Sequence, residues 1–218
     1  MAKSKASTPK QSPEDGTAYL KDRSKDPTKL YRHARIPPLY WGAELPTSGA
    51  IAGYVSQIVL NVSEGVGLLL VGPNGVGKTF AACALAKSVL DFTARVLYIS
   101  APDVVQAYIH DWMFDDDITL AAAFRTRRLL VVDDLGQEYR GSGSGYSEQN
   151  LVNLIRYRIT YKRATVLTTN MNTEQLQETY GKGFASLLQQ GMVTISMTGA
   201  DRRREGRQEL LDRSGVKG

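Results

Sequence analysis

A glycine-rich stretch with one lysine and one threonine has the residue types and spacing that favour chemistry most directly. Residues 72–79 match the pattern G-x-x-x-x-G-K-[ST] of a phosphate-binding loop. Glycine has no Cβ, so successive backbone N–H groups can turn inward around phosphate oxygens, and the start of the next helix adds a positive dipole end. We therefore expect a nucleoside triphosphate to be bound by Gly72, Pro73, Asn74, Gly75, Val76, Gly77, Lys78, Thr79 and Phe80.

Two side chains at the end of this loop have the chemistry that triphosphate binding needs. Lys78 is expected to reach the β- and γ-phosphates, and the Thr79 hydroxyl is expected to ligate Mg²⁺. An apolar run at 67–71 precedes the loop and good helix formers follow it to about residue 91. A glycine-rich turn that binds nothing is the simpler alternative, but it does not explain why every fixed position is filled between a strand and a helix.

Polar side chains follow two further predicted strands. Residues 129–132 are apolar and end in Asp133 and Asp134, and the strand at 165–169 ends in Asn170. Asp133 is expected to hold the metal, directly or through water, and Asp134 to orient or deprotonate the attacking water. Asn170 is expected to hold that water or the γ-phosphate. Turn-forming acids often follow strands, but a phosphate loop upstream favours a functional interpretation.

The remaining periodicity predicts an α/β fold with a parallel sheet covered by helices on both faces. Besides the strands above, strands are expected at 95–100 and 193–197. Helices are expected at 50–63, at 102 to about 112, at 147–162, at 173–179 and at 183–190. A shorter helix is expected between the acidic residues 115–117 and about residue 126. Ligands of such sheets bind at the carboxyl ends of the strands, where the phosphate loop would lie.

Composition and charge divide the chain into three parts. Residues 1–35 are rich in Lys, Ser, Thr, Pro and Asp, which predicts a basic, mostly disordered arm; a folded ATPase domain is expected at 36–204 and a polar tail at 205–218. Residues 1–36 hold nine Lys or Arg and four Asp or Glu, a charge of +5, which equals that of the whole chain. The basic ends contact nucleic acid, contact an acidic partner, or only aid solubility.

Other bulk features indicate where the protein works. There is no apolar segment of membrane-spanning length and no apolar signal region at the N-terminus, so a cytoplasmic protein without a membrane partner is expected. Cys83 is the single cysteine, which excludes an internal disulfide, and its apolar helical setting favours a packing role.

Four segments together resemble one family. The stretches GPNGVGKT, LLVVDDLGQE and TVLTTN, with IPPLYWGAEL ahead of them, are similar to AAA+ ATPases of the bacterial helicase-loader group, which includes DnaC-, DnaI- and IstB-type proteins. The resemblance covers residues 36–204. It implies a P-loop NTPase with a five-stranded sheet in the order 5-1-4-3-2, no sizeable C-terminal helical lid, and ATP with Mg²⁺ bound between subunits of a homo-oligomer. It also implies single-stranded DNA and a replicative helicase as partners, the helicase through the basic arm.

The resemblance also assigns roles to residues of this sequence. Asp133 becomes the Walker B metal ligand, Asp134 the catalytic acid position, Asn170 the sensor-1 residue and Arg203 the sensor-2 arginine, and the segment 36–41 would lie near the adenine. One departure matters, because family members carry arginines in the segment that corresponds to 183–188, where this chain has none. This departure implies slow hydrolysis or an arginine finger from elsewhere, namely Lys182 or the arginines at 202–204.

Two groups of residues have competing interpretations. Aromatic residues followed by arginines between the second and third strands suit nucleic-acid contact, but an i, i+4 aromatic pair on a helix often packs in the core. Cations near the end of the helix at 147–162 form a solvated face or touch DNA or a neighbouring subunit. The first group is Tyr108, Trp112, Phe114, Arg125, Arg127 and Arg128, and the second is Arg156, Arg158, Lys162 and Arg163.

The expected function is that of an ATPase that loads a replicative helicase on single-stranded DNA during DNA replication. Three alternatives stay open at this point. A transposition helper shares every motif, a nucleotide-operated switch with little turnover would fit the missing arginines, and a small-molecule kinase would share the phosphate loop.

Overall fold

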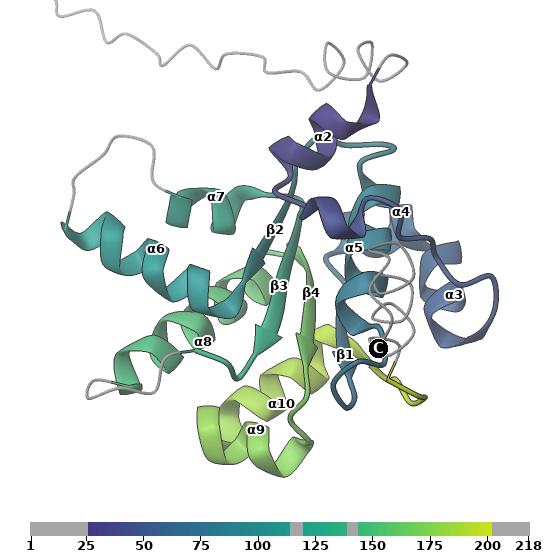
Figure 1. Ribbon diagram of the computed structural model, residues 1–218. Helices are drawn as coiled ribbons and strands as arrows, with labels where there is room; N and C mark the ends of the chain where they lie inside the picture. Colours follow the sequence, from purple (N-terminus) through teal and green to yellow (C-terminus); the bar gives the residue numbers. More distant parts are fainter. Residues whose placement is uncertain (1–25, 114–119, 139–143, 202–218) are drawn as a thin grey trace, which may run out of the picture.

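The computed structural model describes residues 26–113, 120–138 and 144–201 (Figure 1). Five parallel strands form one sheet in the order β2-β3-β4-β1-β5. The predicted order 5-1-4-3-2 is the same sequence of neighbours counted from the other edge, so it is confirmed. The strands are β1 (Gly67–Val71), β2 (Val96–Ser100), β3 (Leu129–Leu135), β4 (Ala164–Thr169) and β5 (Met192–Ser196).

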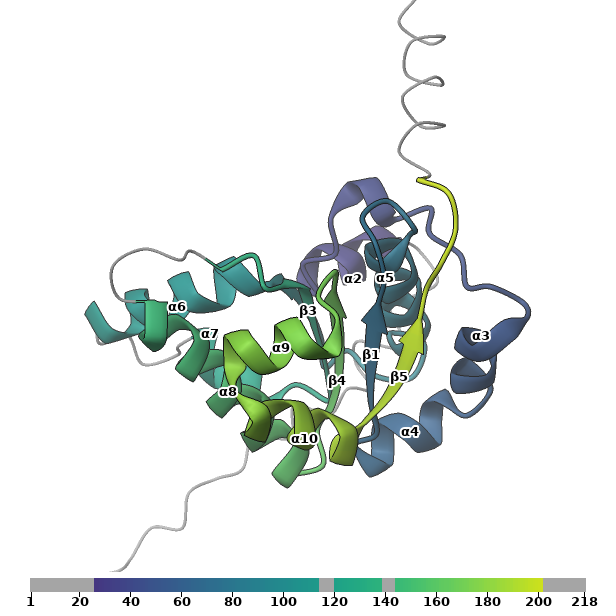
Figure 2. The same ribbon diagram turned by 90° about the horizontal axis from the view of Figure 1, so that it is seen from below.

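Helices cover both faces of the sheet, and each face has its own apolar core (Figures 1 and 2). One layer consists of α2 (Pro27–His33), the 3₁₀ turn η1 (Pro38–Tyr40), α3 (Gly49–Ser56), α4 (Ile58–Glu64) and α5 (Lys78–Val89). The other consists of α6 (Ala101–Met113), α7 (Leu120–Thr126), α8 (Ser144–Thr160), α9 (Thr173–Tyr180) and α10 (Lys182–Gly191). None of the described helices is long and apolar enough to cross a lipid bilayer.

The central strands are buried on both sides, as a parallel sheet between two helical layers requires. Leu68 and Leu70 of β1 point into the core under α5, whereas Leu69 points into the core under α8. Consecutive side chains of each strand thus pack against helices on opposite faces of the sheet. This is why the sequence shows uninterrupted apolar runs at the strands. All five predicted strands are present, and none of their ends differs from the prediction by more than three residues.

Two predictions about the first part of the chain were wrong in detail. The helix expected at 50–63 is broken at Gln57 into α3 and α4, and the Asn61 side chain donates a hydrogen bond to the Tyr54 carbonyl across the break. Ordered structure also begins ahead of residue 36, because α2 starts after an Asp26 N-cap and buries Leu30 against the core. Residues 1–25 and 202–218 lie outside the described residues, so neither the rest of the arm nor the expected absence of a lid is described.

A fully buried arginine connects α8 to two neighbouring elements. The Arg158 guanidinium donates to the carbonyls of Phe124 and Arg127 at the end of α7, and to Ala164 O and Thr165 Oγ1 in β4, over 2.5 to 3.1 Å. Burial lowers the pKa of Arg158 to about 9, so the group is still charged at neutral pH. Arg158 was expected on a solvated or interacting face together with Arg156, Lys162 and Arg163, and its complete burial shows that this prediction was wrong.

Replacement of Arg158 by methionine tests this connection. Arg158→Met should lower the free energy of unfolding by about 3 kcal/mol, because it leaves buried carbonyl oxygens without a donor. The measurement is urea unfolding followed by circular dichroism. Arg156→Met is the matched control, since Arg156 is exposed on the same helix, and it should change stability by less than about 0.5 kcal/mol. Equal effects of the two variants would contradict the assignment.

Candidate nucleotide-binding site

The glycine-rich loop joins β1 to α5 and has the backbone that a phosphate cradle needs. Gly75 and Gly77 have φ of +82° and +96°, in the left-handed region that favours glycine, and Gly77 is the N-cap of α5. A Cβ at Gly72 would lie 2.2 Å from Met197 O, in the segment that follows β5. The loop therefore requires glycine for its turns and for the close approach of that segment.

Lys78 occupies the inside of the loop. Its side chain is buried, and Nζ donates hydrogen bonds of 2.8 Å to the carbonyl oxygens of Gly72 and Pro73. These bonds fold the ammonium group back over the loop, and the start of α5 adds its own positive end there. The arrangement provides the positive charge that an anionic phosphate chain requires.

Asp133 is the centre of a hydroxyl cluster that joins three elements. Its Oδ1 accepts hydrogen bonds from Thr79 Oγ1 of α5 at 3.1 Å and Thr168 Oγ1 of β4 at 2.5 Å. Its Oδ2 accepts one from the Tyr98 hydroxyl of β2 at 2.6 Å. Burial and the Asp133 charge both raise the pKa of Tyr98, so this phenol stays protonated and donates. The buried carboxylate is therefore held in one orientation, directed at Thr79.

Asp134 has an unusual backbone conformation beside this cluster. Its φ is +57°, it is exposed, and its N–H donates to Thr168 Oγ1 at 2.9 Å. The pairing of β3 with β4 shifts between Val132 and Leu135, which is the position of this residue. Non-glycine residues in the left-handed region cost energy and are often found at functional sites. The irregularity turns the Asp134 side chain to the opposite environment from Asp133, out of the core.

Asn170 directly follows β4, next to the first residue of the phosphate loop. Gly72 N–H donates to Thr169 O at 3.2 Å, and Asn170, which follows, is exposed. Asn170 also lines a cavity of about 440 Å³ together with residues 136–138, Met171 and Gln175. The structure thus brings Lys78, Thr79, Asp133, Asp134 and Asn170 to the carboxyl edge of the sheet. Arg203 lies outside the described residues.

The residues present fit ATP and Mg²⁺. The cradle excludes a Cβ at Gly72, and Thr79 with Asp133 forms a hydroxyl–carboxylate pair of the kind that holds Mg²⁺ beside a phosphate. The described residues contain no group of three or more His, Cys, Asp or Glu side chains placed to hold a metal.

Comparison with known proteins agrees with this geometry. The family model described as "IstB-like ATP binding protein" matches residues 59–189, which is more than half of the chain. The chain belongs to this family. As an IstB-like protein it has the P-loop AAA+ fold. The crystal structure of the DnaC helicase loader superposes on it with a TM-score of 0.62 and 23% sequence identity. This match covers 74% of this chain and 100% of the DnaC chain.

Two further relatives act in DNA replication. The chromosomal replication initiator protein DnaA of Streptococcus agalactiae serotype Ia is 30% identical over 113 residues, which are 51% of this chain and 25% of DnaA. The replicative helicase loader DnaI of Bacillus subtilis is 22% identical over 138 residues, 61% of this chain and 43% of DnaI. This IstB-like chain therefore spans a quarter of DnaA and less than half of DnaI.

The segment at 36–45 packs against α5 of the IstB-like domain, behind the phosphate loop. Trp41 Nε1 donates to Ile36 O at 2.9 Å, and Lys87 Nζ of α5 donates to the carbonyls of Trp41 and Ala43 at 2.5 and 2.7 Å. Lys87 thereby fixes the segment to the helix that begins at the loop. Its proximity to adenine stays a prediction.

Three residues of this IstB-like site were missed by the sequence analysis. Tyr98 and Thr168 donate hydrogen bonds from their hydroxyls to Asp133. An apolar strand pattern does not indicate that a hydroxyl within it will reach a residue of the neighbouring strand. Glu138 is buried and accepts hydrogen bonds from Tyr180 Oη at 2.6 Å and Gly136 N at 3.1 Å, which ties the loop after β3 to the end of α9. The only sequence feature that could have indicated a role for Glu138 is its place at the end of the segment LLVVDDLGQE.

Among the residues with competing interpretations, Tyr108 packs on the core. Its ring centroid lies 6.0 Å from that of Phe124 in an edge-on arrangement, and Phe124 is fully buried. The core interpretation of Tyr108 is therefore confirmed. The side chains of Trp112 and Phe114 lie outside the described residues.

The hydroxyl cluster leads to a test by removal of one oxygen. Tyr98→Phe should leave nucleotide affinity in EDTA unchanged and reduce the gain in affinity that Mg²⁺ provides by about 10-fold, because Asp133 loses one of the bonds that orient it. Calorimetric titration with a non-hydrolysable ATP analogue measures both quantities. Tyr54→Phe is the control, since it removes a hydroxyl that bonds to Val66 O outside the site. If the two variants gain equally from Mg²⁺, the proposed orientation of Asp133 is wrong.

Proposed function

We propose that the protein hydrolyses ATP and uses the cycle to help assemble a replicative helicase on single-stranded DNA. The observation that carries this proposal is the contact of Thr79 with Asp133 at the carboxyl edge of the sheet, beside Lys78 and Asn170. The similarity to the helicase loader DnaI supports the choice of process.

Each described residue has a definite task in hydrolysis. The loop and Lys78 bind the phosphates, and Thr79 with Asp133 would hold Mg²⁺, which supplies neutralisation of the phosphate charge when bound. Asp134, exposed and outside the hydroxyl cluster, orients or deprotonates the attacking water. Asn170 at the neighbouring strand end holds that water or the γ-phosphate. Arg203, which lies outside the described residues, is proposed as the sensor-2 residue from the sequence resemblance alone.

Two features of the proposal concern assembly. The chain forms a homo-oligomer with ATP between subunits, and the neighbouring subunit supplies the cation that residues 183–188 lack, from Lys182 or from the arginines at 202–204. The basic N-terminal segment recruits the helicase. A transposition helper that acts on duplex DNA is the second candidate, and the match to the IstB-like family favours it.

ATP hydrolysis measured with and without DNA tests the proposed function. Phosphate release should be slow for the protein alone and should rise at least several-fold with single-stranded DNA. A larger rise with duplex DNA would replace helicase loading by the transposition helper. Tight ATP binding without turnover in all conditions would leave a nucleotide-operated switch, and phosphate transfer to a small acceptor would indicate a kinase.

Two variants separate binding from chemistry. Lys78→Ala should weaken ATP binding about 100-fold, because a charged donor to the phosphates is lost. Asp134→Asn should bind ATP with nearly unchanged affinity and lose turnover by a factor of about 10² to 10⁴, as expected for removal of a general base. Equilibrium binding and single-turnover hydrolysis provide the two readouts. Normal turnover by Asp134→Asn would remove this residue from the mechanism.

A further inference from the structure

Three neighbouring strands of the sheet are each preceded by an arginine. Arg95 precedes β2, Arg128 precedes β3 and Arg163 precedes β4. The strand registers pair Val96 with Leu129 and Leu129 with Ala164, so the three arginines lie side by side in a row. This row is at the amino ends of the strands, at the opposite edge of the sheet from the phosphate loop (Figure 1).

Interactions within the row bring a fourth arginine, Arg127, into the same group. Arg95 O accepts the N–H of Leu129 at 3.2 Å, and Arg95 Nη2 donates to Thr126 O at 2.8 Å, which joins the start of β2 to the end of α7. Burial lowers the pKa of Arg95, and the charges of Arg163, Arg128 and Arg127 lower it further. These four residues, which we call the arginine edge, are thus close enough to repel one another.

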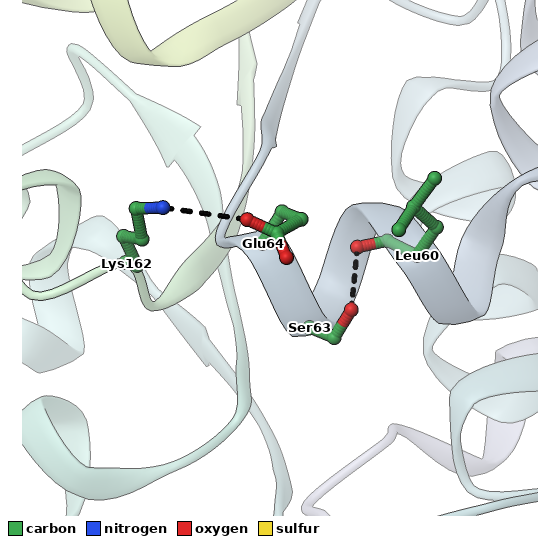
Figure 3. Close-up of polar contacts among 4 residues, drawn as sticks. All are labelled: Leu60, Ser63, Glu64 and Lys162. Carbon is green, nitrogen blue, oxygen red and sulfur yellow. Dashed lines mark hydrogen bonds and ion pairs between the residues drawn. The ribbon is translucent and has the colours of Figure 1, made fainter.

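The repulsion in the arginine edge is not balanced within the described part of the chain. None of its four side chains has a carboxylate within ion-pair distance among the described residues, whereas the adjacent Lys162 pairs with Glu64 of α4 at 3.3 Å (Figure 3). Arg95 and Arg128 are exposed, and Arg127 and Arg163 are half-buried. A cation of the same region therefore has an anion nearby, whereas no carboxylate of residues 26–113, 120–138 or 144–201 pairs with the four arginines.

Hydrogen bonds to Arg158 anchor the backbone under the arginine edge. The buried guanidinium of Arg158 donates to Arg127 O at 3.1 Å, and the N–H of Arg163 donates to Arg158 O at 2.7 Å. Arg158 also adds a fifth positive charge beneath the surface. Like charges held on a fixed framework favour an external anion, because the anion does not need to order them first.

An aromatic pair with one exposed ring lies close in sequence to the arginine edge. Tyr161, two residues before Arg163, is 61% exposed, and its ring lies 4.4 Å from that of Tyr157. The Arg125 guanidinium in turn lies 5.2 Å from the Tyr157 ring. An exposed aromatic ring beside cations suits an unpaired base, which stacks on the ring while its phosphate meets the guanidinium. An acidic peptide would use the cations but not the ring.

We propose that the arginine edge and Tyr161 bind the phosphate backbone and bases of a single-stranded nucleic acid. The inference rests on the proposed function in that it names the surface where the DNA binds. Neighbouring strands are about 4.8 Å apart, so successive guanidinium groups can reach successive phosphates of an extended strand. Because this surface is separated from the phosphate loop by the length of the strands, DNA and ATP do not compete for it.

The salt dependence of DNA binding tests this surface in the full-length protein. The probes are a fluorescent 20-nucleotide oligo(dT), a duplex of the same length, and poly-glutamate as competitor. Arg95→Gln/Arg128→Gln/Arg163→Gln should weaken oligo(dT) binding at least 10-fold. It should also reduce the slope of log K against log salt by about 2, because each phosphate that the protein neutralises in a single strand adds about 0.7 to the slope. Tyr161→Ala should weaken binding about 10-fold without a change of slope.

Two single variants guard against misfolding of the triple variant. Arg128→Glu reverses an exposed charge, and Arg156→Glu reverses an exposed charge on α8 outside the arginine edge. Only the first should reduce the salt slope. Equal slopes for Arg128→Glu, Arg156→Glu and the unchanged protein would overturn the proposal. The proposal would also be overturned if the triple variant lost only duplex binding. If the triple variant still bound oligo(dT) normally but no longer bound poly-glutamate, the surface would instead serve an acidic protein partner.

Hydrolysis assays on the same proteins separate this inference from the proposed function. If DNA still stimulates hydrolysis in the triple variant and its salt slope is unchanged, the surface is wrong and helicase loading stands. If the unchanged protein binds oligo(dT) through the arginine edge but DNA never stimulates hydrolysis, the surface stands and helicase loading is wrong.

Discussion

The Asp133 carboxylate is the point on which the arrangement of the site depends. It is buried, and hydroxyls from α5, β2 and β4 satisfy both of its oxygens. A buried carboxylate is costly unless it is hydrogen-bonded, so three elements must keep their register for the fold to be stable. The same bonds direct the carboxylate at Thr79, which couples the stability of the sheet to the geometry of the phosphate loop.

The parallel sheet gives the protein two chemically different edges. Loops and side chains at the carboxyl ends contain glycines, carboxylates and an amide, which suit a magnesium-bound phosphate chain. The amino ends carry arginines fixed by the buried Arg158. In a parallel sheet, residues at the same end of each strand converge even when they are far apart in the sequence. The described residues thus place the candidate nucleotide site at one edge of the sheet and a row of arginines at the other.

The sequence predicted most of the fold and the centre of the site, because both depend on local signals. Residues 72–79 have a fixed spacing, and apolar runs such as 129–132 mark strands buried on both faces. What it did not predict depends on interactions between distant residues. Arg158 has the same local pattern as exposed Arg156, and only the packing of α8 against α7 and β4 distinguishes them. Likewise Tyr98 reads as an apolar strand residue until β3 places Asp133 beside it.

The left-handed backbone conformation of Asp134 limits how far the stability of the domain can be raised without loss of this side chain. A non-glycine residue at φ +57° carries conformational strain that glycine at the same position would relieve. Glycine, however, has no carboxylate to place beside the substrate. In the role proposed for Asp134, selection for heat resistance alone should favour loss of this side chain, whereas selection for hydrolysis should preserve it, so stability and catalysis would make opposite demands on this position.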